Sequence, residues 1–549
     1  MALTGTALAQ RWGGLNPYSL WLDDQWVVAL VKHASLNDLV ELGPPTPIGF
    51  VFLLKAFDQV GGSGTWRMQL LPFVLGLAQI PLLGWLAFRM TGLASLGMFA
   101  ATLLAGSRFF AVYSLRTKQF VVESFITLLL IALAMMWLRR RSRVRLAVLL
   151  AVAVLVLPVS FTAASVGLVI VNGLLVHVLL DRTGDRRGSR HLAVIAGGLY
   201  NALALTWIVL LQSGQASPAL VRFWQGYYLP VDDFGAAWGF LTTRVSQFLT
   251  GALPDTLTWL ALGVPVAILL LLSRRPTRTL GGALALFYGG MLAASAFHLY
   301  PLGGRRTDIF SYPITILAIT AALWAIGRRW PIVPIAAVVV AVTELVLLFP
   351  RAPIGYPPSP GRAAVELADD LAHEADAIVI APHANWAVGC YGRWPVRLGR
   401  APESTNGFFV EVDRPGTLVL RESLDGVDYR ADRNVVHKQL EGFMQGRPRR
   451  VLFITLERRR RTDEWIAEAI RSHGYTSRPV GAAERGLRIF DIDESSAAPA
   501  GGERGCQLSA LNYQPEGKAK IHRGGPQRAA EKRARFRVQG WGLAAFTEP

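Results

Sequence analysis

The feature that most constrains this chain is a series of long apolar stretches that contain no charged residue. A helix needs about 20 residues to cross roughly 30 Å of hydrocarbon. Stretches of this kind run over Gln69–Phe88, Leu93–Ser107, Leu192–Gln212, Thr256–Ser273, Thr279–His298 and Ile309–Gly327. Each of them is expected to be a membrane-spanning helix.

Further spans follow from stretches that are interrupted only once. Gln119–Leu138 and Pro331–Phe349 each contain a single acid, Glu123 and Glu344. Leu146–Leu180 is too long for one crossing, and its polar centre, 158–165, predicts a turn between two short spans. The sequence therefore predicts a polytopic α-helical membrane protein with about 10 transmembrane helices.

Composition and charge agree with this fold class. Hydrophobic residues make up 52% and charged residues 17% of the 549 residues, whereas soluble domains carry roughly a quarter charged residues. The net charge of +18 comes largely from arginine clusters such as 139–145 that fall on one side of the spans. Such clusters are typical of cytoplasmic loops. We therefore expect the N-terminal loop and everything after Phe349 to lie outside the cytoplasm, and we expect no nucleic-acid partner.

Four regions follow from these patterns. Residues 1–68 form a first outer loop, 69–350 a transmembrane core, 351–493 a small C-terminal α/β extracytoplasmic domain, and 494–549 a disordered basic tail. Amphipathic stretches lie around Leu20–Lys32 and Ile48–Phe57. Within 351–493 the patterns predict helices over Arg362–Ala375, Arg433–Met444 and Thr462–Ser472, and strands over Ala377–Ala381, Val451–Leu456 and Leu487–Ile492.

The first candidate motif is Ser19–Trp26, which holds the adjacent acids Asp23 and Asp24 in an aromatic setting. Taken alone, such a pair is somewhat more often a helix N-cap flanked by interfacial tryptophans than a catalytic pair. The two cysteines of the chain form no CxxC or Cys/His pattern, and there is no Walker or GxGxxG motif. No metal-ligating residues are therefore assigned.

Two further motifs lie on the same predicted face. Tyr113–Phe120 is a charged loop that would ordinarily be solvated, but it leads into Glu123, an intramembrane carboxylate that needs a partner or a water-filled cavity. His298–Thr307 combines glycines, which let a ligand approach the backbone, with Arg305 and Arg306, whose planar forks suit phosphate. Taken alone, such an outer loop is structural about as often as it is functional.

In this order and on one face, the three motifs resemble those of the GT-C superfamily of membrane glycosyltransferases. The resemblance is strongest to bacterial proteins similar to protein mannosyltransferases and to the aminoarabinose and arabinose transferases. The matching positions are Asp23, Asp24, Tyr113, Ser114, Lys118, Gln119, Phe120, Tyr300, Pro301, Gly303, Gly304 and Arg305, and Phe223–Pro230 is similar to an aromatic outer loop of that group. The resemblance covers about Trp12 to Asp493.

The chain departs from the family pattern at three points. Asp24 stands where glutamate is common, and Arg116 stands where an acid is often found. The family also has a span ahead of the acidic loop, which Met1–Tyr18 does not supply. We therefore expect either an upstream start or a chain without this first helix.

The resemblance implies transfer of a sugar from a polyprenyl-phosphate donor to a hydroxyl of a cell-envelope glycan, lipid or protein. The reaction would occur at the outer face of a bacterial inner membrane, among membrane lipids. It gives Asp23 the role of general base, with Asp24 orienting the site. Phosphate-binding residues would be Arg305, Arg306 and Lys118; substrate-binding residues would be Tyr113, Gln119, Glu123, Trp224 and Tyr300. No cofactor is certain, and a divalent cation is left open.

Two other classes of function fit the same sequence. A lipid-linked sugar transporter or flippase would use buried Glu123 and Glu344 for coupling, although no inverted repeat is visible. An inactive relative could bind the lipid as a scaffold. In the α/β region, Pro382–Trp386 follows a strand end and is assigned to packing about twice as readily as to acceptor contact.

Overall fold

The computed structural model describes residues 2–15, 19–59, 64–180, 187–209, 218–273, 277–304, 306–348, 361–401, 407–420, 433–455, 460–479 and 487–492. Met1–Ser496 belong to one compact unit. The predicted tail, 494–549, lies outside the described residues, as does Arg305.

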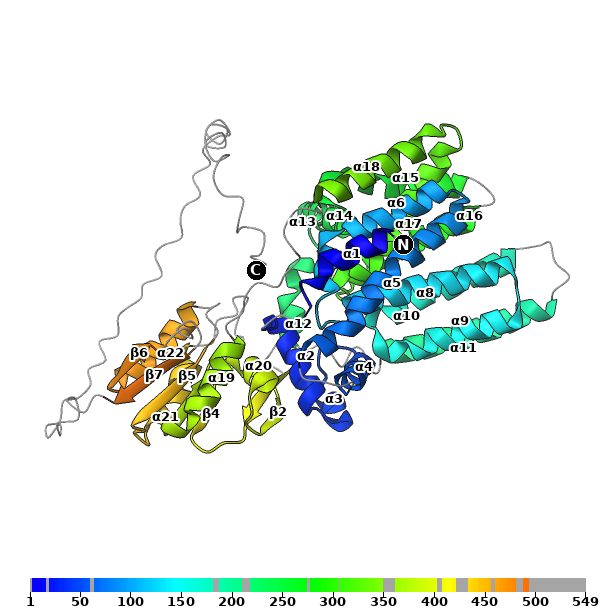
Figure 1. Ribbon diagram of the computed structural model, residues 1–549. Helices are drawn as coiled ribbons and strands as arrows, with labels where there is room; N and C mark the ends of the chain where they lie inside the picture. The colour runs from blue at the N-terminus through cyan, green and yellow to red at the C-terminus, as the bar shows by residue number, and fades with distance from the viewer. Residues whose placement is uncertain are drawn as a thin grey trace, which may run out of the picture. The chain divides into compact units, whose positions relative to one another are not determined.

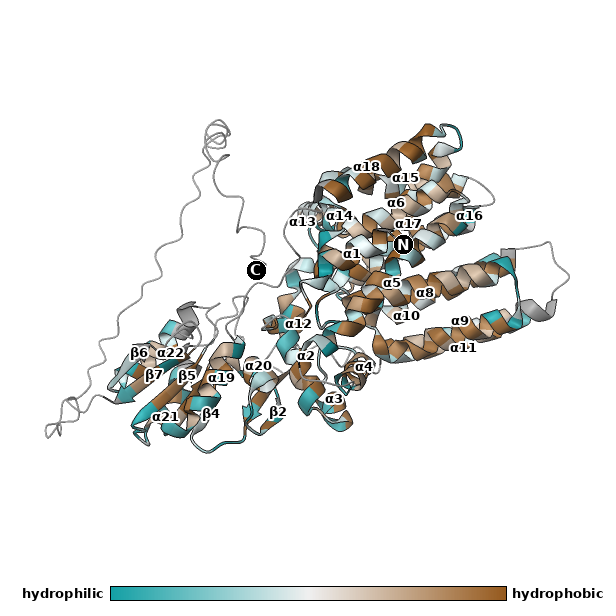
Figure 2. Cartoon of the chain, in the orientation of Figure 1, coloured by the Kyte–Doolittle hydropathy of each residue, from teal (hydrophilic) through white to brown (hydrophobic). Residues whose placement is uncertain are grey.

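A helix occupies every apolar stretch that the sequence predicts to cross the membrane (Figures 1 and 2). These helices are α5 (Trp66–Thr91), α6 (Ala94–Gly106), α8 (Phe120–Arg139), α9 (Arg143–Leu155), α10 (Phe161–Leu180), α11 (Arg187–Trp207), α15 (Gly263–Ser273), α16 (Arg278–Ala296), α17 (Tyr312–Gly327) and α18 (Ile332–Leu348). The predicted division of Leu146–Leu180 is confirmed, because the 3-10 turn η1 (Leu157–Val159) with Pro158 separates α9 from α10. Proline cannot donate the backbone hydrogen bond that would continue α9.

Five helical segments of the described chain are long and apolar enough to cross a membrane. They are Trp66–Thr91, Phe120–Arg139, Phe161–Leu179, Thr256–Ser273 and Thr307–Gly327. The chain is therefore a multi-pass helical membrane protein. The count of about ten crossings stays a prediction, because the remaining apolar helices are shorter.

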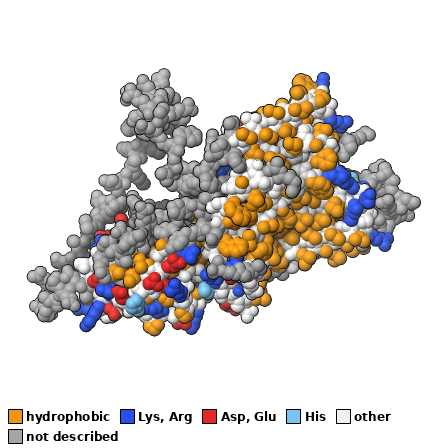
Figure 3. Space-filling view, viewed as in Figure 1, with side chains coloured by type: hydrophobic (Ala, Val, Ile, Leu, Met, Phe, Trp, Pro, Cys, Tyr) orange, Lys and Arg blue, Asp and Glu red, His pale blue; other side chains and the backbone are white. Residues whose placement is uncertain are grey.

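Close packing of small residues and an apolar exterior are the physical marks of this helical part. A Cβ added at Gly97 of α6 would lie 2.8 Å from the Gly84 carbonyl oxygen of α5, so glycine at both positions lets these helices approach. Apolar side chains cover the face of the helical part seen in Figure 3. Leu199, for example, is 68% exposed. Patches of this extent are unusual on soluble monomers and fit a lipid-facing surface.

Shorter helices precede and connect the apolar ones. They are α1 (Ala2–Trp12), α2 (Leu22–His33), α3 (Leu36–Leu42), α4 (Ile48–Asp58), α7 (Arg108–Tyr113), α12 (Pro218–Phe223), η4 (Gln225–Tyr227), α13 (Phe234–Phe240), η5 (Leu241–Val245), α14 (Ser246–Thr250), η6 (Asp255–Leu262) and η8 (Thr307–Ser311). Both stretches predicted to be amphipathic in the first 68 residues are helical, as α2 and α4. Only α4 is buried on one side; in α2 every residue from Asp24 to Val31 is buried, so the prediction of an amphipathic stretch there is wrong.

The C-terminal part is an α/β structure with a five-stranded sheet. Its elements are α19 (Gly361–Leu371), η9 (Ala372–Glu374), β1 (Ala377–Ile380), α20 (Ala384–Tyr391), β2 (Val396–Arg400), β3 (Phe408–Val412), β4 (Thr417–Val419), α21 (Arg433–Met444), β5 (Arg450–Ile454), α22 (Arg460–Ser472), β6 (Tyr475–Pro479) and β7 (Leu487–Ile492). The strand order is β4-β1-β5-β7-β6, and β2 and β3 form a separate antiparallel pair. β4, β1 and β5 are parallel, whereas β7 runs antiparallel to β5 and β6.

All six predicted elements of this part form within a few residues of their expected bounds. The sequence reasoning missed α20, β2, β3, β4 and β6. β2 (VRLGR), β4 (TLV) and β6 (YTSRP) lack the run of four apolar residues that marks β1 and β5.

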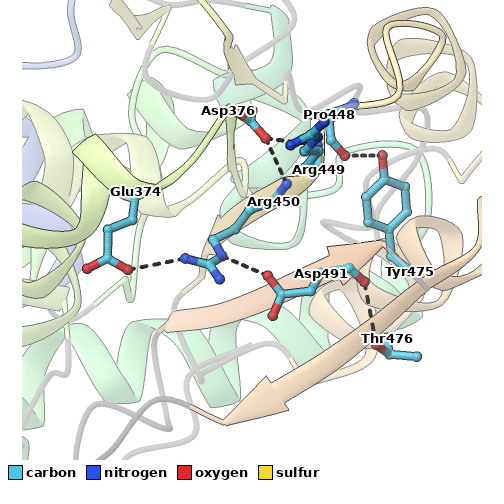
Figure 4. Close-up of polar contacts among 8 residues, drawn as sticks. All are labelled: Glu374, Asp376, Pro448, Arg449, Arg450, Tyr475, Thr476 and Asp491. Carbon is cyan, nitrogen blue, oxygen red and sulfur yellow. Dashed lines mark hydrogen bonds and ion pairs between the residues drawn. The ribbon is translucent and has the colours of Figure 1, made fainter. Parts of the chain in front are cut away.

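A polar cluster ties together the starting ends of β1 and β5 (Figure 4). The Asp376 carboxylate accepts hydrogen bonds from the backbone N–H groups of Arg449 and Arg450, at 2.9 and 3.0 Å. The Arg450 guanidinium donates to Asp491 at 2.7 Å and to Glu374 at 3.2 Å. These contacts hold together the amino-terminal ends of β1 and β5. The helix α20 follows the other, carboxyl end of β1.

Candidate active site

The acidic pair lies in the first turn of α2. Trp21 occupies the N-cap position and makes no side-chain cap hydrogen bond, so the N-cap alternative for the two acids is wrong. Negative charge is favoured at this end of a helix by the backbone dipoles. The two carboxylates differ in exposure, because the side chain of Asp24 is 0% exposed and that of Asp23 is 28% exposed.

The charged loop between α7 and α8 is buried, so the interpretation of this loop as a solvated segment is wrong. Arg116 is 8% exposed, Lys118 5% and Gln119 4%. The Arg116 Nε atom lies 3.3 Å from Asp24 Oδ2, and its guanidinium is 5.3 Å from the Trp21 ring centroid. The second motif is thus held against the first by a buried ion pair.

The third motif reaches the acidic pair through Arg306. Its Nη1 atom donates to Asp23 Oδ2 at 2.6 Å, and its guanidinium lies 5.2 Å from the Trp224 ring centroid. The neighbouring glycines make this approach possible. A Cβ at Gly304 would lie 3.0 Å from the Trp224 ring. Gly303 has a φ of +76°, which favours glycine, and it packs closely against the backbone of Arg244.

Lys118 completes the cluster. Its Nζ atom lies 3.5 Å from the centroid of the Trp26 ring. Burial lowers the pKa of Lys118 to about 7, although the charges of Asp23 and Asp24 act to raise it. When Lys118 is protonated, the cluster holds three cations and the two carboxylates of the acidic pair, and therefore one positive charge in excess. A site of this kind suits an anionic ligand.

This pKa predicts how phosphate binding depends on pH. Because the folded-state pKa is lowered to about 7, Lys118 is charged below that pH and neutral above it. The advantage of the wild type over Lys118→Met in binding a polyprenyl phosphate should therefore be largest near pH 6 and shrink as the pH rises through about 7.

The Kd ratio of the two proteins is the right measurement, because the phosphate itself titrates with a second pKa of about 6. The ratio removes the effect of that titration on every contact other than the one with Lys118. A bound phosphate raises the lysine pKa, so the decline is expected at a somewhat higher pH than in the free protein. A ratio that stays constant between about pH 6 and 9 would contradict a phosphate contact by Lys118.

Three other residues predicted to bind substrate, Glu123, Tyr300 and Tyr113, contact other parts of the protein. Glu123 is 3% exposed, and its Oε1 atom accepts the backbone N–H of Phe161, the first residue of α10, at 3.0 Å. The Tyr300 hydroxyl donates to the Thr307 carbonyl. Tyr113 packs between Phe109 and Phe120, with centroid distances of 4.8 and 5.6 Å.

The cluster therefore unites part of the predicted set. Asp23, Asp24, Lys118, Arg306 and Trp224 come together, and Tyr113 borders them through its ring contact with the Arg116 guanidinium. The Gln119 carboxamide oxygen has no hydrogen-bond partner among the described residues. Arg305 belongs to the predicted phosphate set but lies outside the described residues.

Three contributions to the site were missed by sequence reasoning. Arg116 was noted only as a departure from an acidic pattern, yet it pairs with Asp24. Trp26 was treated as an interfacial residue, yet it faces Lys118. Arg244, in the π-helical turn η5, borders the site through its backbone, which packs against Gly303 of the third motif, while its guanidinium stacks 3.8 Å from the Tyr227 ring. No local spacing in the sequence would have revealed these contacts.

Among the described residues, no group of three or more His, Cys, Asp or Glu side chains could hold a metal ion. The groups that this part of the chain offers to a phosphate are arginine and lysine side chains.

Comparison with known proteins gives likenesses of fold only. No protein-family model matches the chain, and no curated protein matches its sequence. Among the solved structures that match, two cover 91% of this chain and 97% of their own length. One is ArnT from Cupriavidus metallidurans in the apo state, at 14% identity and a TM-score of 0.47. The other is the same protein bound to undecaprenyl phosphate, at 12% identity and a TM-score of 0.45.

Proposed function

We propose that the chain is a GT-C-like glycosyltransferase that moves a sugar from a polyprenyl-phosphate donor to an acceptor hydroxyl. The reaction takes place on the extracytoplasmic face of a bacterial inner membrane. The observation that carries the proposal is the cluster at the start of α2, where a partly exposed carboxylate lies among three cations beside membrane-spanning helices.

The chemistry needs one base and a site for the departing phosphate. The acceptor oxygen attacks the anomeric carbon, the bond from that carbon to the phosphate oxygen breaks, and the acceptor proton passes to a carboxylate. Phosphate is already a good leaving group, so the acid catalyst that glycoside hydrolases use is not required. Cations around the phosphate stabilise its developing charge.

Exposure supports a division of roles within the acidic pair. Asp23 is the general base, because its side chain is 28% exposed and can meet an acceptor. Asp24 is fully enclosed and paired with Arg116, which suits an orienting role. Arg306 and Lys118, together with Arg305, bind the donor phosphate, and Trp224 and Tyr300 border the sugar. The acceptor is a cell-envelope glycan, lipid or protein.

The rival function is movement of a lipid-linked sugar across the membrane. A coupling carboxylate should be able to exchange partners, but Glu123 holds the first backbone N–H of α10. That contact accounts for its burial without a transport role and favours the enzyme.

One pair of measurements tests the proposal. The purified protein in detergent is incubated with polyprenyl-phosphate sugars and a glycan or lipid acceptor, and transfer of labelled sugar is followed. The same protein in liposomes is assayed for movement of the lipid between leaflets. We expect transfer without movement; movement without transfer would replace the enzyme by a transporter, and neither would favour a lipid-binding scaffold.

A further inference from the structure

The α/β part is attached to the beginning of the helix that carries the acidic pair. The backbone N–H of Leu20, just before α2, donates to the Tyr391 hydroxyl at the end of α20 at 2.5 Å. The backbone N–H of Arg362, in α19, donates to the Ser19 hydroxyl at 3.4 Å. The chain that enters α2 is thus fixed from the α/β side.

The other end of α2 is held by the same helix. The ring of His33 donates from Nε2 to the Gly389 carbonyl oxygen at 2.8 Å. The Lys32 ammonium donates to the Cys390 carbonyl oxygen. Carbonyls at the end of α20 are open to side-chain donors because no further helical turn uses them, and cations are favoured there.

Between these two ends, α2 and α20 are in direct contact at a glycine. A Cβ added at Gly389 would lie 3.0 Å from the Ala29 Cβ of α2 and 2.9 Å from the Val410 side chain of β3. Any larger residue at this position must push the two helices apart. Ala29 lies three residues after Trp26, so such a shift would act within one turn of the residue that faces Lys118.

A row of aromatic rings links the α/β part to Lys118. Trp386 of α20 packs against Phe408 of β3 at a centroid distance of 4.9 Å, and Phe408 packs against Trp26 at 6.2 Å. The other partner of Trp26 is the Lys118 ammonium, 3.5 Å from its ring centroid. Trp26, Trp386 and Phe408 are all buried and belong to the same hydrophobic core as the membrane helices.

We propose that the α/β part is a positioning element of the active site: α20 and β3 fix Trp26, and Trp26 fixes Lys118 beside the acidic pair. The inference rests on the proposed function and assigns the α/β part a role in it, which is to position Lys118. Trp26, Phe408 and Gly389 are positioning residues, because they act on the site through Lys118 and α2. It also agrees with the packing role expected for the segment Pro382–Trp386, whose Trp386 is buried against Phe408.

The test is Gly389→Val, with Gly442→Val as its matched control. Gly442 lies in α21 of the same α/β part, and a Cβ there would meet nothing within 4 Å. We expect Gly389→Val to lower sugar transfer about 10²-fold, which is the usual loss when reacting groups are misplaced by about 1 Å. Gly442→Val should transfer sugar like the wild type.

A second measurement does not depend on turnover. The rate at which acetic anhydride modifies Lys118 is followed against pH by mass spectrometry. In the wild type the midpoint should fall near the lowered pKa of about 7. In Gly389→Val, water reaches the ammonium and the midpoint should move upward by at least one unit, whereas Gly442→Val should leave it in place.

Tyr391→Phe keeps the argument testable if Gly389→Val fails to fold. It keeps the ring and removes only the hydroxyl that accepts from Leu20, so transfer should fall by about tenfold with the protein folded. A Lys118 midpoint and a transfer rate in Gly389→Val or Tyr391→Phe equal to those of Gly442→Val would overturn the positioning role. An inactive wild type whose Lys118 midpoint still shifts in Gly389→Val would instead refute the proposed function alone.

Discussion

Replacing Asp23 by Asn should lower sugar transfer by about 10²- to 10⁴-fold, the contribution that a positioned general base usually makes. The amide keeps the size of the side chain and can still accept a hydrogen bond from Arg306, but it cannot take the proton of the acceptor. Binding of a polyprenyl phosphate should be retained. The measurement is transfer of labelled sugar in detergent, with lipid binding measured on the same preparation.

Two controls separate catalysis from folding. Asp58→Asn removes a charge in the same N-terminal segment, where Asp58 pairs with Arg67 at 3.3 Å and is 29% exposed; such a pair contributes about 0–1 kcal/mol and should leave transfer unchanged. Asp24→Asn should be milder than Asp23→Asn in transfer per folded molecule. Full activity of Asp23→Asn would end its assignment as the base.

The contact between Arg306 and Asp23 bears on the order of events. The guanidinium that holds Asp23 at 2.6 Å is also one of the groups proposed to bind the donor phosphate. A phosphate that competes for Arg306 would release the carboxylate to accept a proton. Base and phosphate site are thereby coupled through one side chain, and binding of the donor would precede activation of the acceptor.

The helical fold was largely predictable because it depends on local patterns. An uncharged apolar stretch specifies a membrane helix without knowledge of its neighbours, and every predicted stretch is helical. Leu146–Leu180 is divided as expected, although the turn lies at Leu157–Val159 and most of the predicted turn, 158–165, belongs to α10. The strands β2, β4 and β6 were missed because they contain polar or very few residues and no long apolar run, and what a strand sequence favours depends strongly on the neighbours it packs against.

Part of the membership of the cluster was predictable, but its contacts were not. Asp23, Asp24, Lys118 and Arg306 were chosen from three separate motifs, and they do lie together. Their pairing follows from tertiary packing that no spacing in the sequence encodes. Arg116 shows this most directly. It breaks an acidic pattern, and the structure supplies the reason, because an acid so close to the enclosed Asp24 would repel it, whereas an arginine neutralises it.

That pairing leads to the largest expected loss of stability. Arg116→Met keeps a long unbranched side chain but removes the guanidinium, whose Nε atom lies 3.3 Å from Asp24 Oδ2. Both side chains of this pair are less than a tenth exposed. Removing one partner of a buried ion pair generally costs about 3–5 kcal/mol, because the other charge stays buried. We expect a markedly lower Tm in detergent and a smaller yield of folded protein.

The double variant Arg116→Met/Asp24→Asn distinguishes a charge effect from a packing effect. If the cost arises from the uncompensated carboxylate, removing that charge should restore much of the lost stability, so the two single effects should not add. Arg397→Met serves as the control for loss of an arginine, since its 2.8 Å pair with Asp413 is mostly exposed and should contribute about 0–1 kcal/mol. Strict additivity of the two substitutions at Arg116 and Asp24 would show that the pair does not hold the loop against α2. The position of Lys118 would then depend on Trp26 and the α/β part alone.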